Sequence, residues 1–263
     1  MDILEIFGWI SAMVAGIVMG LLGGGGSTIA VPVLVFLLGV SPVNATAYSL
    51  FIVGCAATIG TWGSMKRGQV DFKTGMTFAI PSLFAVYVVQ RWGIPAIPEH
   101  WNAWGHIMSR DSLIMLVFSI LMLGAAHSMI RKSSEPLGVS KNKLALWFVP
   151  LEGLVVGALT GLVGAGGGFL IIPALVLFTG LNMQVAIGTS LLIISMKSFV
   201  GFFGALSNGF PMDWTLLLSF ASLTMVGTYL GTKWRKHLDS NLLKKAFGWF
   251  ILVMAIGILA SEL

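Results

Sequence analysis

Two long stretches of this chain carry no charged residue. Residues 6–65 and 153–196 contain no Asp, Glu, Lys or Arg. One helical membrane crossing needs only about 20 apolar residues, so each stretch must hold more than one membrane segment. The 263-residue chain is 57% hydrophobic and 10% charged, with a mean hydropathy of +0.94, which excludes an ordinary soluble domain. We therefore expect an all-α polytopic membrane protein.

A glycine-rich motif occurs twice, 141 residues apart. The run that begins at Gly20 reads Gly-Leu-Leu-Gly-Gly-Gly-Gly, the run that begins at Gly161 reads Gly-Leu-Val-Gly-Ala-Gly-Gly-Gly, and a proline follows each. Between residues 16–50 and 157–191, 13 of 35 positions are identical. A duplicated helix-breaking motif inside apolar sequence is typical of a transporter built from two repeats.

Apolar runs predict ten membrane segments, five in each half. Two of them, 27–38 and 168–179, would be about 18 Å long as helices, too short to cross a hydrocarbon core of about 30 Å. Each follows a glycine run, so we expect short Gly-broken half-helices, arranged either as re-entrant hairpins or as two crossings. The other predicted segments are 5–22, 43–65, 73–90, 112–130, 145–163, 184–207, 214–232 and 245–261.

The basic residues gather between these segments. Of the 15 Lys and Arg residues, 12 lie in 66–73, 131–143 and 233–245. Clusters at these places follow the positive-inside rule, whereas the net charge of +5 taken alone would suggest nucleic-acid binding. We place the three clusters in the cytoplasm and the protein in the cell (inner or plasma) membrane.

With this assignment the two halves enter the membrane from opposite faces. We expect an N-terminal repeat at 1–132, a cytoplasmic linker at 133–143 and a C-terminal repeat at 144–263, related as inverted-topology repeats. Both termini are then outside. The Trp-rich stretch 91–111 is expected to be an outer loop or short helix at the headgroup level.

The glycine runs are candidate anion sites. A broken helix leaves free N–H groups and a positive dipole end at the start of the next half-helix, and Ser27 and Thr28 could add hydroxyls. The alternative is close helix packing through small residues, which suits Gly16 and Gly157 in particular. A nucleotide-phosphate loop is excluded, because no Gly-Lys-Ser/Thr follows either run.

Hydroxyl groups and one lysine lie in the segments that follow. Ser49 and Ser190 match across the repeat; they could bind one anion from two sides or bond the carbonyls of their own helices. Lys197 is the only basic residue inside a predicted crossing, and a charge at that depth suggests function by default, with snorkelling to an interface as the alternative. Asp71 and Asp213 follow equivalent glycines and are expected to cap the next helices.

The sequence resembles the TauE/SafE family of sulfite-exporter-like membrane permeases. The resemblance rests on Gly161–Gly168 with its downstream proline, on Thr189-Ser190-Leu191, and on Gly68-Gln69-Val70-Asp71, and it covers nearly the whole chain. The first glycine run departs mildly at Gly24 and Ser27, and the second Gly-to-Asp pattern carries an insertion. The resemblance implies transport of small sulfur-containing anions, whereas the residues themselves lead only to an anion.

We therefore expect a secondary transporter of sulfite or an organosulfur compound, working by alternating access and coupled to protons or membrane potential. An anion channel and a non-transporting anchor subunit are the alternatives. No enzyme activity, cofactor, metal site or nucleic-acid partner is expected; the expected partners are a small anion and the lipid bilayer, and a homodimer is left open. The predicted substrate-binding residues are Gly24, Gly25, Gly26, Ser27, Thr28, Tyr48, Ser49, Gly166, Gly167, Gly168, Thr189, Ser190 and Lys197.

Overall fold

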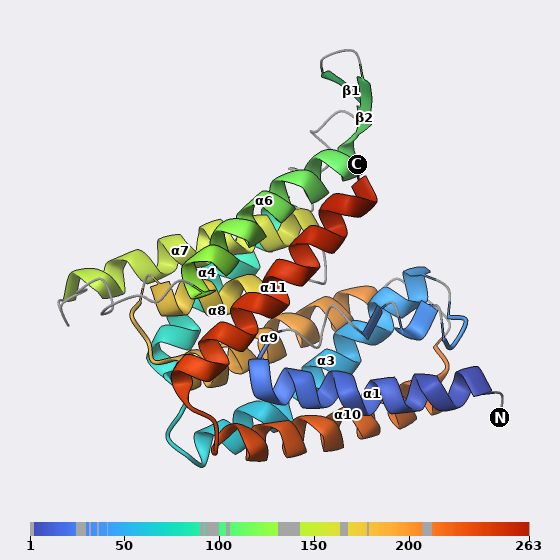
Figure 1. Ribbon diagram of the computed structural model, residues 1–263, viewed down its shortest axis with the longest axis horizontal. Helices are drawn as coiled ribbons and strands as arrows, with labels where there is room; N and C mark the ends of the chain where they lie inside the picture. The colour runs from blue at the N-terminus through green and yellow to red at the C-terminus, as the bar shows by residue number, and fades with distance from the viewer. Residues whose placement is uncertain are drawn as a thin grey trace.

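The computed structural model describes most of the chain as long α-helices with one short hairpin (Figure 1). The described residues are 3–24, 30–31, 33–35, 37–40, 42–89, 92, 100–103, 106–130, 143–163, 168–177, 179–206 and 212–262. The helices are α1 (Ile3–Leu22), α3 (Pro42–Met65), α4 (Phe72–Val88), α6 (Arg110–Ile130), α7 (Lys143–Val163), α8 (Gly168–Leu177), α9 (Met183–Leu206), α10 (Trp214–Arg235) and α11 (Ser240–Glu262), and the strands are β1 (His100–Ala103) and β2 (His106–Ser109).

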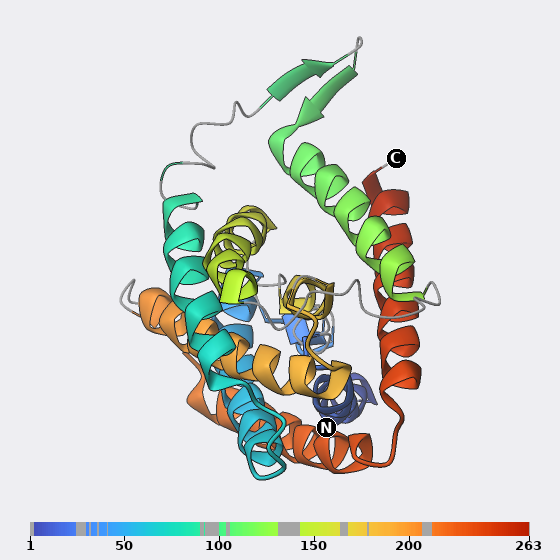
Figure 2. The same ribbon diagram turned by 90° about the vertical axis from the view of Figure 1, so that its left-hand side faces the viewer.

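Helices of the two halves of the chain pack against each other in pairs. α1 lies along α10, and α7 lies along α4, while α3 packs on α9 and α6 on α11 (Figures 1 and 2). By order within each half, α1 corresponds to α7 and α4 to α10. The first helix of each half therefore packs on a late helix of the other half, so neither half forms a separate bundle.

Glycines allow the long pairs to approach closely. A Cβ on Gly157 of α7 would lie 2.5 Å from the carbonyl oxygen of Ser82 in α4, and a Cβ on Gly16 of α1 would collide with the carbonyl of Thr224 in α10. Gly16 and Gly157 are equivalent in the repeat, and so are Ser82 and Thr224. Small residues at such crossings are how membrane helices pack closely. The packing role expected for Gly16 and Gly157 is confirmed.

One short half-helix is fully described. α8 has 10 residues, about 15 Å of helix, which is too short for a membrane crossing. It follows the second glycine run, as the sequence predicted. In the first half, residues 30–31 and 33–35 at the equivalent place are helical.

Both of these short segments end in the same backbone motif. Gly39 and Gly180, which are equivalent in the repeat, have φ angles of +65° and +67°. The N–H of the residue after each glycine donates to the carbonyl six residues earlier, over 2.9 Å in the first half and 3.4 Å in the second. A glycine in the left-handed conformation just beyond a helix end is a common C-terminal cap. The two halves that are similar in sequence therefore also share this backbone conformation.

The stretch 91–111 contains a β-hairpin, which the sequence did not predict. β1 and β2 pair antiparallel with Ala103 opposite His106. The expectation of a loop or short helix is wrong for residues 100–103 and 106–109 of this stretch. The hairpin projects beyond α6 in Figure 1.

Several described helices are long enough to cross a membrane, and the outer surface of the bundle is apolar. Exposed apolar side chains such as Phe84 and Val253, with 65% and 66% of their surface exposed, cover the outside of the bundle and suit contact with lipid. Shorter apolar helices cover Phe7–Leu22, Phe72–Val88 and Val149–Thr160. Within the described residues, the helices long and apolar enough to cross a membrane are Asn44–Met65, Met183–Leu206, Trp214–Arg235 and Ser240–Gly257.

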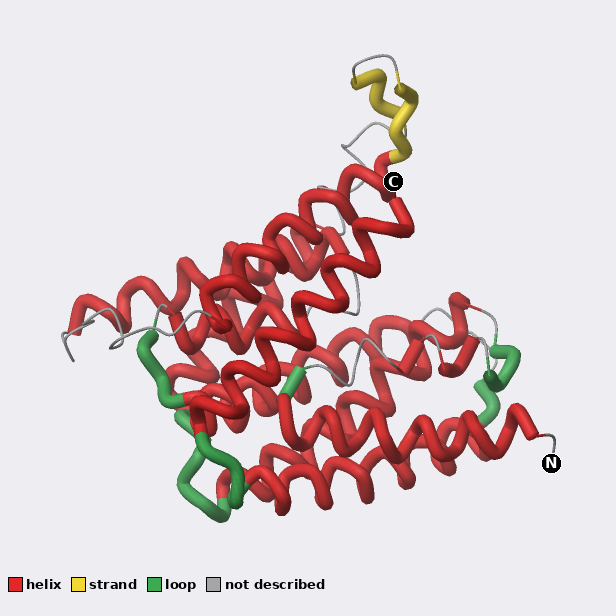
Figure 3. The backbone as a smooth tube through the Cα atoms, viewed as in Figure 1, coloured by secondary structure: helices red, strands yellow, loops and turns green. Residues whose placement is uncertain are grey.

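The two ends of the bundle differ. The α3–α4 turn (66–71) and the α10–α11 turn (236–239) lie close together, and we call this the basic end; both turns are green at the lower left of Figure 3. The start of α1, the end of α11 and the hairpin lie towards the other end (Figure 1). This separation agrees with the predicted topology, in which both termini are opposite the basic turns. That the basic end faces the cytoplasm stays a prediction.

Candidate functional site

About half of the predicted site residues lie in the described part of the chain. Gly24 follows α1, and Gly168 is the first residue of α8. Tyr48 and Ser49 lie in α3, and Thr189, Ser190 and Lys197 lie in α9. Outside the described residues are Gly25, Gly26, Ser27, Thr28, Gly166 and Gly167.

The start of the first glycine run reaches residues of the second half. Gly23 has a φ of +83°, a left-handed conformation that favours glycine. A Cβ at this position would lie 2.6 Å from Ile172 Cδ1 of α8 and 2.9 Å from Ser190 Oγ of α9. The structure thus brings the first glycine run next to one of the two paired serines, as expected if both halves contribute to one site.

The paired serines make equivalent hydrogen bonds. Ser49 Oγ donates to the carbonyl of Thr46, and Ser190 Oγ donates to that of Ile187, both over 2.8 Å. Both serines are buried. In this conformation each hydroxyl proton is used within its own helix, the alternative that the sequence left open. A serine here would have to rotate its hydroxyl to donate to an anion.

In each half, the residue before the paired serine accepts a hydrogen bond from the aspartate that caps a helix of the other half. The backbone N–H of Asp213 donates to Tyr48 Oη over 2.5 Å, and that of Asp71 donates to Thr189 Oγ1 over 3.0 Å. Tyr48 and Thr189 are equivalent in the repeat and both are buried. These two bonds tie each half to the other at corresponding points.

Both aspartates also cap helices, as predicted. Asp71 Oδ1 accepts from the N–H of Thr74 at the start of α4, over 3.0 Å. Asp213 Oδ1 accepts from the N–H groups of Thr215 and Leu216 at the start of α10, over 3.0 and 3.1 Å. Side-chain oxygens at this position satisfy amides that a helix start leaves free.

Lys197 of α9 reaches α7 with its ammonium. Its Nζ donates to Thr160 Oγ1 over 2.9 Å, and Thr160 is 2% exposed. The Thr160 hydroxyl in turn donates to the carbonyl of Gly157 over 3.0 Å. Within the described residues no carboxylate pairs with this ammonium, which has three donors to satisfy. A partly buried cation in such a setting attracts an anion.

Comparison with known proteins gives the family. Residues 9–258 match the family described as Sulfite exporter TauE/SafE. The chain belongs to the TauE/SafE family. It is 26% identical over 255 residues to a "Probable membrane transporter protein" of Xylella fastidiosa (strain 9a5c), covering 95% of this chain and 92% of that protein. It is 28% identical over 250 residues to "Probable membrane transporter protein YunE" of Bacillus subtilis (strain 168), covering 87% and 88%.

These names indicate a membrane transporter rather than an enzyme. A further relative, "Probable membrane transporter protein YdhB" of Bacillus subtilis (strain 168), is 25% identical over 236 residues and is covered to 90% of its length. The match extends over both halves, so the TauE/SafE assignment does not rest on the glycine motif alone. The TauE/SafE resemblance seen in the sequence is confirmed.

Sequence reasoning missed two charged residues of this TauE/SafE protein. Glu152 lies within α7, and its buried Oε2 has no hydrogen-bond partner among the residues that the structure describes. Arg235 ends α10 and is 1% exposed, although the charge pattern placed it in a cytoplasmic loop. Glu152 had a signal in the sequence, since a carboxylate inside an apolar segment suggests function. No feature of the sequence distinguishes Arg235, because its neighbouring lysines are exposed.

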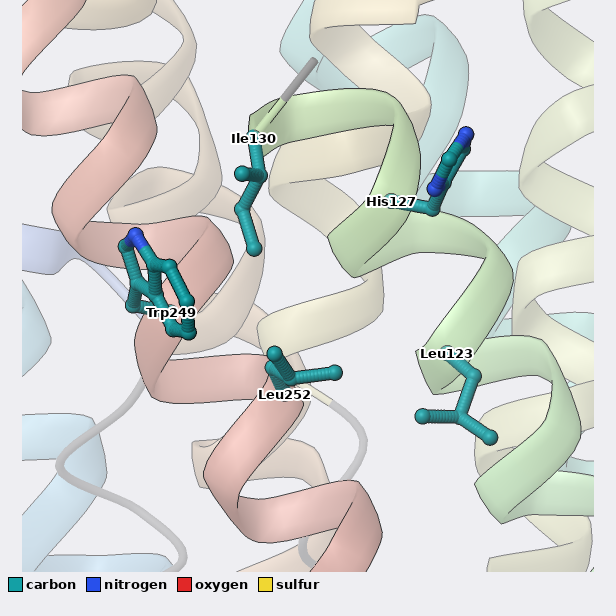
Figure 4. Close-up of a pocket in the computed structure, with 5 residues that line it drawn as sticks. All are labelled: Leu123, His127, Ile130, Trp249 and Leu252. Atoms are coloured by element: carbon teal, nitrogen blue, oxygen red, sulfur yellow. The ribbon is translucent and has the colours of Figure 1, made fainter.

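A groove between α6 and α11 lies apart from these residues. It has a volume of about 650 Å³ and is lined by Leu123, His127, Ile130, Trp249 and Leu252 (Figure 4). None of the predicted site residues lines it. Its lining is mostly apolar, and among its lining residues only His127 and Trp249 carry side-chain N–H groups, so it offers few donors for the anion expected of a TauE/SafE transporter.

Proposed function

We propose that this protein is a secondary transporter of a small oxyanion, sulfite or an organosulfur compound such as a sulfonate or thiosulfate. The family description supports the sulfur chemistry, and the residues support the negative charge. One observation carries the proposal: the partly buried ammonium of Lys197 in α9 is bonded to the hydroxyl of Thr160 in α7. An anion that binds there gains a charge-assisted hydrogen bond in a setting of low dielectric.

We propose that transport proceeds by alternating access of two inverted halves. The support is the repetition of contacts: α1 on α10 and α7 on α4, the two glycine caps, and the two cross-half bonds to the caps of α4 and α10. Two equivalent sets of contacts give a structure in which one set opens while the other stays closed. Gly23 and Ser190, which meet at the start of the first glycine run, then lie where both halves can reach the anion.

Coupling to protons is part of the proposal, and Glu152 is the residue that serves it. It is a carboxylate within a membrane helix, and one of its oxygens lacks a hydrogen-bond partner. Protonation removes the cost of burying its charge, so a proton can accompany a conformational change that buries this side chain. Lys197 would then bind the anion, and Glu152 would carry the proton.

The test is flux into proteoliposomes that contain the purified protein. Uptake of sulfite, sulfate, thiosulfate, taurine and sulfoacetate is measured for the wild type, for Lys197→Gln and for Lys73→Gln, which removes an exposed lysine at the start of α4. We expect saturable uptake of at least one of these anions, abolished in Lys197→Gln and kept in Lys73→Gln. Full activity of Lys197→Gln would remove Lys197 from the mechanism.

The same experiment separates the alternatives. A carrier shows counterflow, in which unlabelled anion inside the vesicle accelerates uptake of labelled anion, whereas a channel shows flux without saturation. A non-transporting anchor shows neither flux nor thermal stabilisation by any of the anions, since a ligand stabilises the folded state only if it binds it.

A further inference from the structure

Two arginines meet at the basic end without a carboxylate. Arg235 at the end of α10 and Arg67 in the α3–α4 turn both donate to Gln69 Oε1, Arg235 Nη2 over 3.4 Å and Arg67 Nε over 3.2 Å. Two like charges thus share one neutral acceptor. Neither arginine forms an ion pair with another described residue.

The remaining contacts of Arg235 are also with neutral groups. Its Nη2 donates to Ser64 Oγ over 2.7 Å, and its Nη1 donates to the carbonyl of Gly20 over 3.2 Å. Gly20 opens the first glycine run, so this arginine holds the end of α1 where the helix gives way to that run. The Gln69 amide in turn donates to Gln184 at the start of α9 over 2.6 Å. The cluster therefore joins four helix ends.

Both guanidinium groups keep a buried donor that has no partner in the described part of the chain. These are Nε of Arg235, whose side chain is 1% exposed, and Nη2 of Arg67. A Cβ on Gly63 of α3 would lie 3.8 Å from Arg67 Nη2 and 3.1 Å from Thr232 Cγ2 of α10, so this donor lies near Gly63. Burial lowers the pKa of Arg67, which lies in the turn outside the membrane-spanning helices. Burying a charge with unused donors is costly unless an opposite charge is present.

A small oxyanion supplies both the missing hydrogen-bond acceptors and the opposite charge. Its oxygens are acceptors only, and guanidinium forks match such oxygens in geometry and charge. We propose that Arg235 and Arg67 form an oxyanion site at the basic end, which the transported anion occupies before or after it reaches the first glycine run. This inference rests on the proposed function for the identity of the anion. The same chemistry is found in an anionic lipid headgroup, and the experiment separates the two sources.

The test uses the full-length protein, purified in detergent without added lipid. Binding of sulfate is measured by calorimetry at constant ionic strength, with chloride as the competing anion, for the wild type, Arg67→Gln and Lys233→Gln. Lys233 is exposed two residues before Arg235, so Lys233→Gln removes an equal charge nearby without touching the cluster. We expect Arg67→Gln to bind sulfate at least tenfold more weakly and Lys233→Gln to bind as the wild type does.

Arg67 is preferred to Arg235 for the first variant. Replacing Arg235 breaks its bonds to Gly20 and Ser64 and can prevent folding, whereas Arg67 is only partly buried. Arg235→Lys, which keeps the charge but loses the fork, is the second variant, and we expect it to weaken sulfate binding. Equal affinities in the wild type and Arg67→Gln would overturn the proposal. So would an interaction seen with phosphatidylglycerol vesicles but not with free sulfate.

Flux measurements keep this inference separate from the proposed function. For anion supplied at the basic end, we expect Arg67→Gln to raise KM at least tenfold with turnover at saturation within twofold of the wild type, whereas Lys197→Gln loses turnover. If no anion is transported while sulfate still binds through Arg67, the oxyanion site stands and the proposed function fails. If Lys197→Gln blocks transport while Arg67→Gln leaves both KM and sulfate affinity unchanged, the site fails and the proposed function stands.

Discussion

The helix pair α4–α7 gives a prediction that can be worked out from one distance. A Cβ on Gly157 would lie 2.5 Å from the Ser82 carbonyl oxygen, whereas ordinary van der Waals contact begins at 3.4 Å. Gly157→Ala must therefore push α7 and α4 apart by roughly 0.9 Å. A gap of about 0.5–1 Å forfeits a quarter to a half of the dispersion energy between the separated atoms, and overpacking of this kind costs about 1–3 kcal/mol.

The matched control is Gly257→Ala in α11. Nothing lies within 4 Å of a Cβ at Gly257, so this change adds only the helix propensity of alanine, a gain of about 0.8–1 kcal/mol. Both glycines lie in helices, so the gain in propensity is common to the two variants, and we expect them to differ by the overpacking cost of about 1–3 kcal/mol. For a chain of this size, that is roughly 2–12 °C in melting temperature.

The assay is thermal unfolding of both variants in the same detergent, followed by tryptophan fluorescence. Gly157→Ala is expected to melt below the wild type, and Gly257→Ala at or above it. Melting temperatures within about 2 °C of each other would refute the claim that Gly157 permits close contact of α7 with α4. Gly16→Ala should behave like Gly157→Ala, because a Cβ there collides with a backbone carbonyl of α10.

Further predictions concern the polar groups. Thr160→Val removes the hydrogen-bond partner of Lys197 and should destabilise the fold by about 1–3 kcal/mol, with Thr160→Ser close to the wild type in the same melts. Glu152→Gln should bind the transported anion but transport it equally well with and without an imposed pH gradient; an unchanged response to the gradient would exclude Glu152 as the proton carrier. Asp71→Ala should cost about 1 kcal/mol through loss of the α4 cap, and Asp71→Asn much less, as read from denaturant titrations.

Much of the helical framework could be predicted from the sequence. Long apolar runs fix where helices begin and end, because charged and turn-forming residues are excluded from them. Predicted segments such as 43–65 and 184–207 thus fall within two residues of α3 and α9. The pairing of Gly39 with Gly180 also followed from the repeat, since a left-handed residue at a helix end is commonly glycine.

Other features depend on tertiary contacts, which cannot be inferred from a local sequence pattern. Arg235 has the same neighbours in the sequence as an exposed loop residue, and only the approach of α1 and α3 buries it. The prediction ended the helix at 232, three residues too early, because it assigned Lys233 and the two basic residues that follow it to the loop. The hairpin at 100–109 was missed because its tryptophans and histidines show no clear strand alternation.

Because α1 packs on α10 and α7 packs on α4, the two helix pairs form at different times during synthesis of the chain. α7 emerges from the ribosome after its partner α4 and can pack at once, but α1 must wait for α10. From Leu22 to Trp214, synthesis at about 5–20 residues per second takes roughly 10–40 s. During that interval the glycine face of α1 meets lipid or an insertion factor instead of α10. Two helix pairs that are equivalent in the finished protein therefore form under different conditions, and the later of these two includes Gly20, where the first glycine run begins.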